Sequence, residues 1–217
     1  MLAYSSVWFG ILFLRGLSKV PSRTGTYIFL RMLLNLYAGM RWDVGCDWIN
    51  YLGHFYAVGE PGFSPWDRSI EQGWWLLMDT VESLGLPYYM LNLIVAVLFF
   101  LCIHRMARLQ DDRVTFLIVL FPMLLLGIVM AAVRQAVAIG FVTIALLAFI
   151  DRTPLKMAFW LAVASMFHIS ALIFAPLLPV SWGKLTRGRV FFGLLIAAPI
   201  AALVISSESA DHANNVY

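Results

Sequence analysis

Long apolar runs, separated by short polar segments, make up most of the chain. Five runs contain no aspartate, glutamate, lysine or arginine: 83–103, 114–133, 135–150, 157–183 and 190–207. Two more lie nearer the N-terminus, a short one at 1–14 and one at 24–40 that only Arg31 interrupts. A helix needs about 20 apolar residues to cross the hydrocarbon core of a bilayer. The pattern predicts an all-α, polytopic membrane helix bundle, with about seven or eight membrane helices in one membrane domain, residues 1–217.

Composition supports this prediction. Hydrophobic residues make up 62% of the 217 residues and charged residues only 12%, against roughly 25% charged residues in a typical soluble domain. The net charge of +3 would point to nucleic acid in a soluble protein. Here the basic residues are better explained as topology signals in membrane loops, so no nucleic-acid partner is expected. Cys46 lies in a polar loop and Cys102 in an apolar run, so no disulfide is expected between them.

Charged residues separate into two kinds of segment. Four segments are basic and contain Arg15, Lys19 and Arg23; His104, Arg105, Arg108 and Arg113; Arg152 and Lys156; and Lys184, Arg187 and Arg189. The segment 42–87 is acidic, with Asp43, Asp47, Glu60, Asp67, Glu71, Asp79 and Glu82 against one arginine, Arg68. The positive-inside rule places the basic segments in the cytoplasm and 42–87 outside, as an external loop and interfacial helix region. The expected location is the inner (cytoplasmic) membrane.

This orientation predicts two hairpins, because basic segments on one side must be separated by an even number of crossings. The first hairpin turns near 131–134 and the second near His168. Each limb of the second has roughly 13 residues, or about 20 Å, which is short of the hydrocarbon thickness. We therefore expect a short hairpin that is re-entrant or has its tip in a cavity below the outer surface. Pro176 and Pro179 should break or kink its returning limb. A single long span through His168 is the competing topology.

The predicted topology brings the unusual polar residues to the outer side. These residues are Arg41, Asp43, Asp47, Glu71, Gln72, Arg134 and His168. Charged groups near membrane depth cost several kcal/mol unless they are paired, hydrated or lining a cavity. Each also has a purely structural explanation: Arg134 could reach the interface, His168 could be a buried hydrogen-bonded residue, and the aspartates could lie in a solvated loop. Convergence on one side favours a functional site.

Four motifs in these segments resemble the EpsG-type family of Wzy-like polysaccharide polymerases. Residues 41–51 read RWDVGCDWINY, which is similar to the family's arginine, Gly-x-Asp and tyrosine pattern. The other three motifs are EQGW at 71–74, VRQAVA at 133–138 and SMFHISA at 165–171. The resemblance covers roughly residues 27–204. Members of the family are usually much longer, so the chain could be incomplete at its C-terminus, with residues from the missing part completing the site.

The resemblance implies a membrane glycosyltransferase. Such an enzyme extends an exopolysaccharide, capsule or O-antigen-type glycan on the outer (periplasmic or extracellular) face of the membrane. Its donor is an oligosaccharide on a polyprenyl pyrophosphate, commonly undecaprenyl, and its acceptor is the sugar end of another lipid-linked repeat. Membrane lipid and other polysaccharide synthesis or export proteins are further expected partners. The resemblance implies no cofactor and no metal.

The residue types fit that chemistry. A guanidinium suits a pyrophosphate leaving group, because it stays charged and donates paired hydrogen bonds, so Arg134 and Arg41 are candidates. His168 is a candidate general base, and Asp47 is its rival. We count His168, Asp47 and Arg134 as catalytic candidates. The substrate-binding candidates are Arg41, Asp43, Tyr51, Glu71 and Gln135.

Two other functions remain open at this stage. A transporter or flippase could move a lipid-linked glycan without chemistry, but it should bind its cargo near the bilayer midplane, where this sequence has few charges. A non-catalytic subunit of a polysaccharide synthesis complex is the other alternative. The concentration of polar candidates on one side favours an enzyme that works from outside.

Overall fold

The computed structural model describes residues 2–17, 24–45, 47–60, 62, 70–183 and 186–214. All regular structure in these ranges is helical, as the sequence predicts. In chain order the helices are α1 (Leu2–Leu17), α2 (Thr24–Gly39), α3 (Trp48–Val58), α4 (Gln72–Ser83), α5 (Tyr88–Ala107), α6 (Arg113–Leu120), the π-helix η1 (Phe121–Val129), α7 (Val133–Ile150), α8 (Pro154–Ser165), the 3-10 helix η2 (Ile169–Leu177), α9 (Leu178–Ser181) and α10 (Arg187–Asn214).

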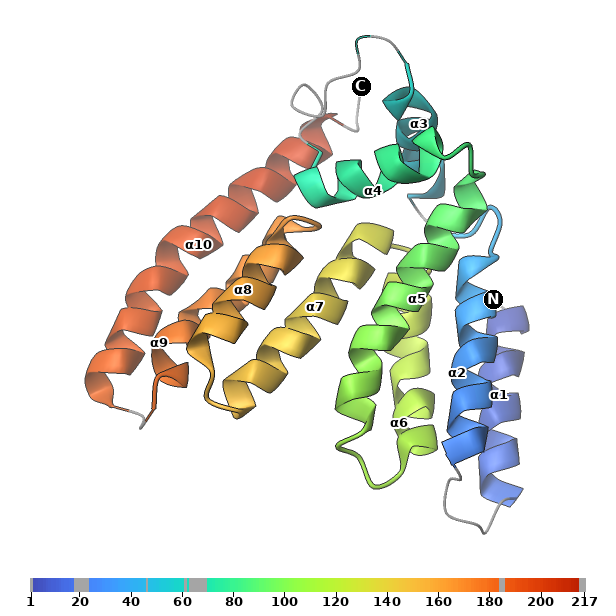
Figure 1. Cartoon of the computed structure of the whole chain (residues 1–217), viewed down its shortest axis with the longest axis horizontal. Coiled ribbons are helices and arrows are strands. Elements are labelled where there is room, and N and C mark those ends of the chain that lie inside the picture. The colour runs from blue at the N-terminus through green and yellow to red at the C-terminus, as the bar shows by residue number, and fades with distance from the viewer. Residues whose placement is uncertain are drawn as a thin grey trace.

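The long helices lie in a row, and α4 lies across one end of it, beside α3 (Figure 1). Along the row α2 packs against α5, α5 against α7, and α7 against α8. The α5–α6 and α7–α8 turns and the start of α10 lie at the end opposite to α4. The described parts of the four basic segments therefore share one end, as the predicted even number of crossings requires. The external region predicted at 42–87 contributes α3 and α4 to the other end.

Among the described helices, three are long and apolar enough to cross a bilayer: α5, α7 and the part Arg187–Ser206 of α10. Helices α1 and α2 have 16 residues each and α8 has 12, so all three fall below the length of an untilted span. The chain is a membrane protein by this measure. Of the expected seven or eight membrane helices, the structure supports three.

The apolar run around His168 forms a short hairpin. Helix α8 leads into a turn at 166–168, and the chain returns through η2 and the four-residue α9. Pro176 and Pro179 lie in this returning limb, which is not a continuous α-helix, as the sequence predicts. The 12 residues of α8 extend about 18 Å. The prediction of a short hairpin is confirmed, and the single long span is wrong.

A proline explains the change from α6 to the π-helix η1. Pro122 has no backbone N–H, so it cannot donate to the carbonyl of Ile118, four residues earlier. The indole N–H of Trp8 on α1 donates to that carbonyl at 3.1 Å instead. The contact satisfies an acceptor that the helix itself leaves open and ties α1 to α6.

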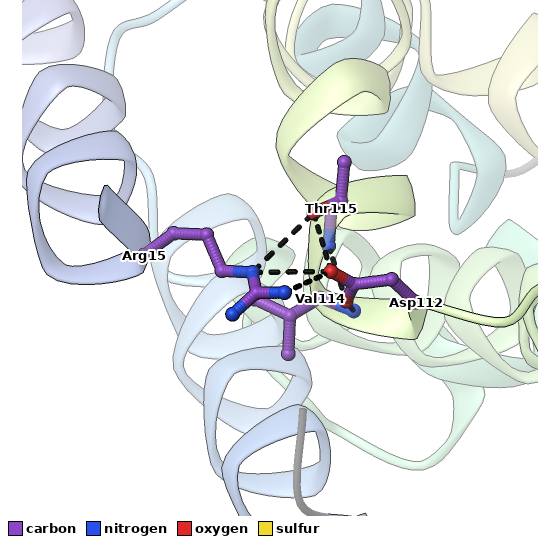
Figure 2. Close-up of polar contacts among 4 residues, drawn as sticks. All are labelled: Arg15, Asp112, Val114 and Thr115. Carbon is purple, nitrogen blue, oxygen red and sulfur yellow. Dashed lines mark hydrogen bonds and ion pairs between the residues drawn. The ribbon is translucent and has the colours of Figure 1, made fainter. Parts of the chain in front are cut away.

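A second polar contact ties the same two helices at the other end of α1 (Figure 2). Asp112 caps α6 by accepting the backbone N–H groups of Val114 and Thr115, each at 3.1 Å, and Arg15 forms an ion pair with its carboxylate. Burial raises the pKa of Asp112, but hydrogen bonds from Thr115 and Arg15 outweigh this effect and hold that pKa well below its usual range. The ionised cap therefore anchors α1 to the start of α6.

Some sequence-based expectations fall on residues outside the described ranges. Cys102 is a buried free thiol in α5. Cys46, the second cysteine in the prediction that no disulfide forms, lies outside the described ranges. The same holds for Lys19, Arg23, Asp67, Arg68 and Lys184.

Candidate functional site

The site is built where α4 begins against the tip of the His168 hairpin. The backbone N–H of Gly73, in the first turn of α4, donates to the carbonyl of Met166 at 2.8 Å. A Cβ on Gly73 would stand 2.8 Å from that same oxygen, so any larger residue would push the two backbones apart. The contact fixes the start of α4 over the hairpin tip. Glu71, which precedes the first residue of α4, is thereby held beside His168.

Glu71 joins two of the catalytic candidates. Its Oε1 lies 3.0 Å from Nδ1 of His168, and its Oε2 accepts a hydrogen bond from Nη1 of Arg134 at 2.7 Å. The side chains of Arg134 and Glu71 are 19% and 13% exposed, so this ion pair is largely shielded from water. Arg134 lies in the first turn of α7, where the helix dipole disfavours a cation. The Glu71 carboxylate offsets that cost.

The charge on Glu71 determines the hydrogen-bonding state of His168. Burial raises the pKa of Glu71, but the hydrogen bond with His168 and the charge of Arg134 outweigh it, so the pKa is lowered. An ionised carboxylate only accepts hydrogen bonds, so Nδ1 of His168 carries the proton. In the neutral ring Nε2 is then an acceptor. The amide of Gln135, with its nitrogen 3.1 Å away, donates to Nε2.

Tyr51 of α3 covers the other side of Arg134. The guanidinium carbon lies 5.5 Å from the centre of the Tyr51 ring, within the range of a cation–π contact. Trp74 of α4 packs edge-on against the same ring at 5.7 Å between centroids. Burial raises the pKa of the Tyr51 hydroxyl, and Arg134 offsets this only in part. Tyr51 therefore stays protonated at neutral pH and can donate a hydrogen bond.

A second glycine brings the 41–51 segment against the first hairpin. Gly45 has a φ of +115°, which residues with a side chain rarely adopt. A Cβ there would stand 2.5 Å from the carbonyl oxygen of Met130, in the turn before α7. Asp47 follows at the start of α3 and lies within electrostatic range of Tyr51. The signature segment and the first turn of α7 are thus neighbours.

Arg41 is placed in an adjoining group of residues. It is 6% exposed and donates to the carbonyl of Ala38 at 2.9 Å and to Oδ1 of Asn92 at 3.1 Å. The first bond satisfies a carbonyl at the end of α2, and the second ties α2 to α5. Tyr88 lies within electrostatic range of both Arg41 and Tyr51, so this group adjoins the main one. Asp43 is exposed, with a φ of +51°.

The structure therefore brings together five of the eight candidates: Tyr51, Glu71, Arg134, Gln135 and His168. Asp47 and Arg41 lie beside this group, and Asp43 is at the surface. Sequence reasoning missed Asn92, which is fully buried, because it lies in an apolar stretch and resembles a core residue. It also missed the close contacts of Gly45 and Gly73, although both glycines belong to the motifs.

Comparison with known proteins places the chain in a family. No curated protein and no solved structure matches it. The sequence model of the EpsG family matches residues 26–211. The match includes every member of the site and leaves out all of α1 and the first two residues of α2. The match covers most of the chain and all four motifs. The chain belongs to the EpsG family, whose members are membrane proteins of polysaccharide biosynthesis.

Proposed function

We propose that the protein is a polysaccharide polymerase that transfers a glycan from one polyprenyl pyrophosphate to the sugar end of another lipid-linked repeat. The observation that carries the proposal is the Glu71–His168–Arg134 network, which sets a base and a cation side by side in a chain of this family. We place the reaction on the outer face of the cytoplasmic membrane. The acidic 42–87 region supports that side.

In the proposed reaction His168 is the general base. The acceptor hydroxyl takes the place of the Gln135 amide at Nε2 and gives its proton to that nitrogen. The hydroxyl oxygen bonds to the anomeric carbon of the donor, while the bond from that carbon to the pyrophosphate oxygen breaks. The pyrophosphate leaves with the electron pair. Glu71 is the positioning residue, because it holds the ring in the required tautomer and stabilises the imidazolium that forms.

Arg134 is suited to the leaving group. Glu71 takes a hydrogen bond from Nη1, while the buried Nε–H of Arg134 has no partner among the described residues. A pyrophosphate could accept from it. The first turn of α7 adds open backbone N–H groups and the positive end of its dipole, which also favour an anion. Charge that develops on the pyrophosphate would be stabilised by groups already in place.

The test is a polymerisation assay with purified protein in liposomes and lipid-linked oligosaccharide from the host. We expect a ladder of products from wild type on a gel. His168→Ala should lower the rate about 10²- to 10⁴-fold, the usual contribution of a general base. Arg134→Gln should lower it as well, because one donor to the leaving group is lost.

The control is Asp79→Asn, which removes a carboxylate from α4 at a position away from the network. It should leave the ladder unchanged. A wild-type ladder that persists in both His168→Ala and Arg134→Gln would contradict the assigned roles. If folded wild-type protein gives no ladder with authentic substrate, the result would contradict the proposed polymerase activity. It would favour a transporter or a partner-dependent subunit.

A further inference from the structure

Three helices place four basic side chains together at the end opposite to the Glu71 network. Arg31 comes from α2, His104 and Arg108 from the end of α5, and Arg113 from the start of α6. His104 lies within electrostatic range of all three arginines. We call these four residues the arginine cluster. The proposed polymerase chemistry makes no use of it.

A specific contact fixes the geometry of the cluster. The hydroxyl of Tyr27 lies 3.0 Å from Nδ1 of His104, and the two rings stack at 5.6 Å between centroids. Tyr27 and Arg31 are four residues apart on α2, and His104 and Arg108 are four apart along α5 and its cap, so each pair shares a helix face. The contact therefore holds Arg31 and Arg108 on facing sides of the two helices.

The charge of the cluster is not neutralised by carboxylates. None of the ion pairs in the described part of the chain includes Arg31, Arg108 or Arg113. Asp112, next to Arg113 in sequence, is taken by Arg15 and by the cap of α6. The Nε of Arg31 is buried and has no partner among the described residues. Three arginines near one histidine repel one another, so an anionic ligand would stabilise this arrangement.

The helix that carries Arg31 also has an exposed apolar face. Residues of α2 next to Arg31 expose large apolar side chains, namely Ile28, Phe29, Met32, Leu33 and Leu36. A soluble anion would gain nothing from this surface, whereas acyl chains would cover it. We propose that the arginine cluster binds the phosphate headgroup of an anionic membrane lipid, with its acyl chains along the exposed face of α2. Arginine suits a phosphate because its guanidinium donates paired hydrogen bonds.

The test measures lipid binding by the purified full chain. Phosphatidylglycerol is titrated into detergent-solubilised protein, and bound lipid is counted by native mass spectrometry, with zwitterionic phosphatidylcholine as reference. We expect preferential binding of phosphatidylglycerol. Arg31→Gln and Arg108→Gln should each weaken it about tenfold, the effect of losing one charge-assisted hydrogen bond. Arg108 is exposed, so its replacement tests the site without disturbing packing.

The matched control is Arg105→Gln. Arg105 carries the same charge at the same end of α5, but it is adjacent to His104 in sequence and therefore faces another direction, toward Cys102. Its replacement should leave the affinity unchanged. An equal fall in Arg105→Gln would show diffuse charge attraction and overturn the proposal, as would equal binding of both lipids. Displacement of the lipid by millimolar inorganic phosphate would overturn the assignment to a lipid.

Discussion

At the scale of single residues, Glu71 connects the base and the cation of the site. One carboxylate oxygen faces His168 and the other faces Arg134, so its single charge serves both partners. Neutral glutamine could still accept one hydrogen bond, but it could not balance the arginine. The residue that the sequence marks only as a binding candidate therefore joins two of the catalytic candidates.

Replacing Glu71 should cost both activity and stability. We expect Glu71→Gln to lower the polymerisation rate toward that of His168→Ala, by about 10²-fold, because the ring loses its orienting acceptor. The free energy of unfolding should fall by about 1–3 kcal/mol, since Arg134 loses a largely buried counter-ion. Gel ladders and thermal unfolding in detergent measure the two effects. Wild-type values for both would show that the network has no function.

The lowered pKa of Glu71 predicts a pH dependence of stability. A carboxylate with a depressed folded pKa contributes fully above its unfolded pKa, about 4.3, and this contribution is lost as the pH falls through the folded pKa. The difference in unfolding temperature between wild type and Glu71→Gln should be constant from neutral pH to about pH 5 and shrink below that. A gap that widens in acid would contradict the assigned direction.

At the scale of elements, the position of α4 over the hairpin tip depends on Gly73. Gly73→Ala places a methyl group 2.8 Å from the carbonyl oxygen of Met166, so α4 has to move away from the tip and take Glu71 with it. We expect polymerisation to fall strongly while the protein still inserts and purifies. The matched control is Gly53→Ala on α3, where a methyl group meets no atom within 4 Å. Equal polymerisation activity in Gly73→Ala and Gly53→Ala would contradict the proposed role of the contact between Gly73 and Met166.

The first helix provides a second prediction about elements. Trp8→Phe keeps the aromatic ring but removes the N–H that bonds the open carbonyl of Ile118. Leaving that carbonyl without a partner should cost about 1–3 kcal/mol. The variant should unfold at a lower temperature in detergent than wild type. An unchanged unfolding temperature would contradict this prediction, because it would show that the hydrogen bond from Trp8 to the Ile118 carbonyl does not contribute to stability.

Much of the helical pattern could be predicted from sequence, because spans and turns follow from runs of apolar residues. The hairpin turn at 166–168 and the broken returning limb were foreseen from charge and from Pro176. The π-helix was not foreseen, and neither was the donor that Trp8 of α1 supplies to the carbonyl of Ile118. The contacts of Gly73, Asn92 and Trp74 were also out of reach, because they arise only when distant helices approach.

At the scale of the whole molecule, the chain has two polar ends. The network around Glu71 lies at one end, under α4, and the arginine cluster lies at the other, with apolar helices between them (Figure 1). The positive-inside rule predicts that the arginine end faces the cytoplasm and that the α4 end faces the outside. The proposed chemistry requires this orientation.

Labelling of single cysteines tests the orientation. In a background with Cys46→Ser and Cys102→Ala, Thr80→Cys on α4 should react with a membrane-impermeant maleimide added to intact cells, because Thr80 is exposed at the predicted outer end. Asp151→Cys, in the α7–α8 turn, should react only after the membrane is opened. Labelling of both positions from the same side would contradict the predicted topology.

The proposed function is the formation of glycosidic bonds with release of a polyprenyl pyrophosphate. The most direct measurement is the amount of free polyprenyl pyrophosphate released by the purified protein, compared with the number of linkages formed from lipid-linked repeats. We expect one released carrier for each new linkage in wild type, and formation of both products about 10²- to 10⁴-fold slower in His168→Ala. Movement of lipid-linked repeats across the bilayer, with no carrier released by folded wild type, would contradict it.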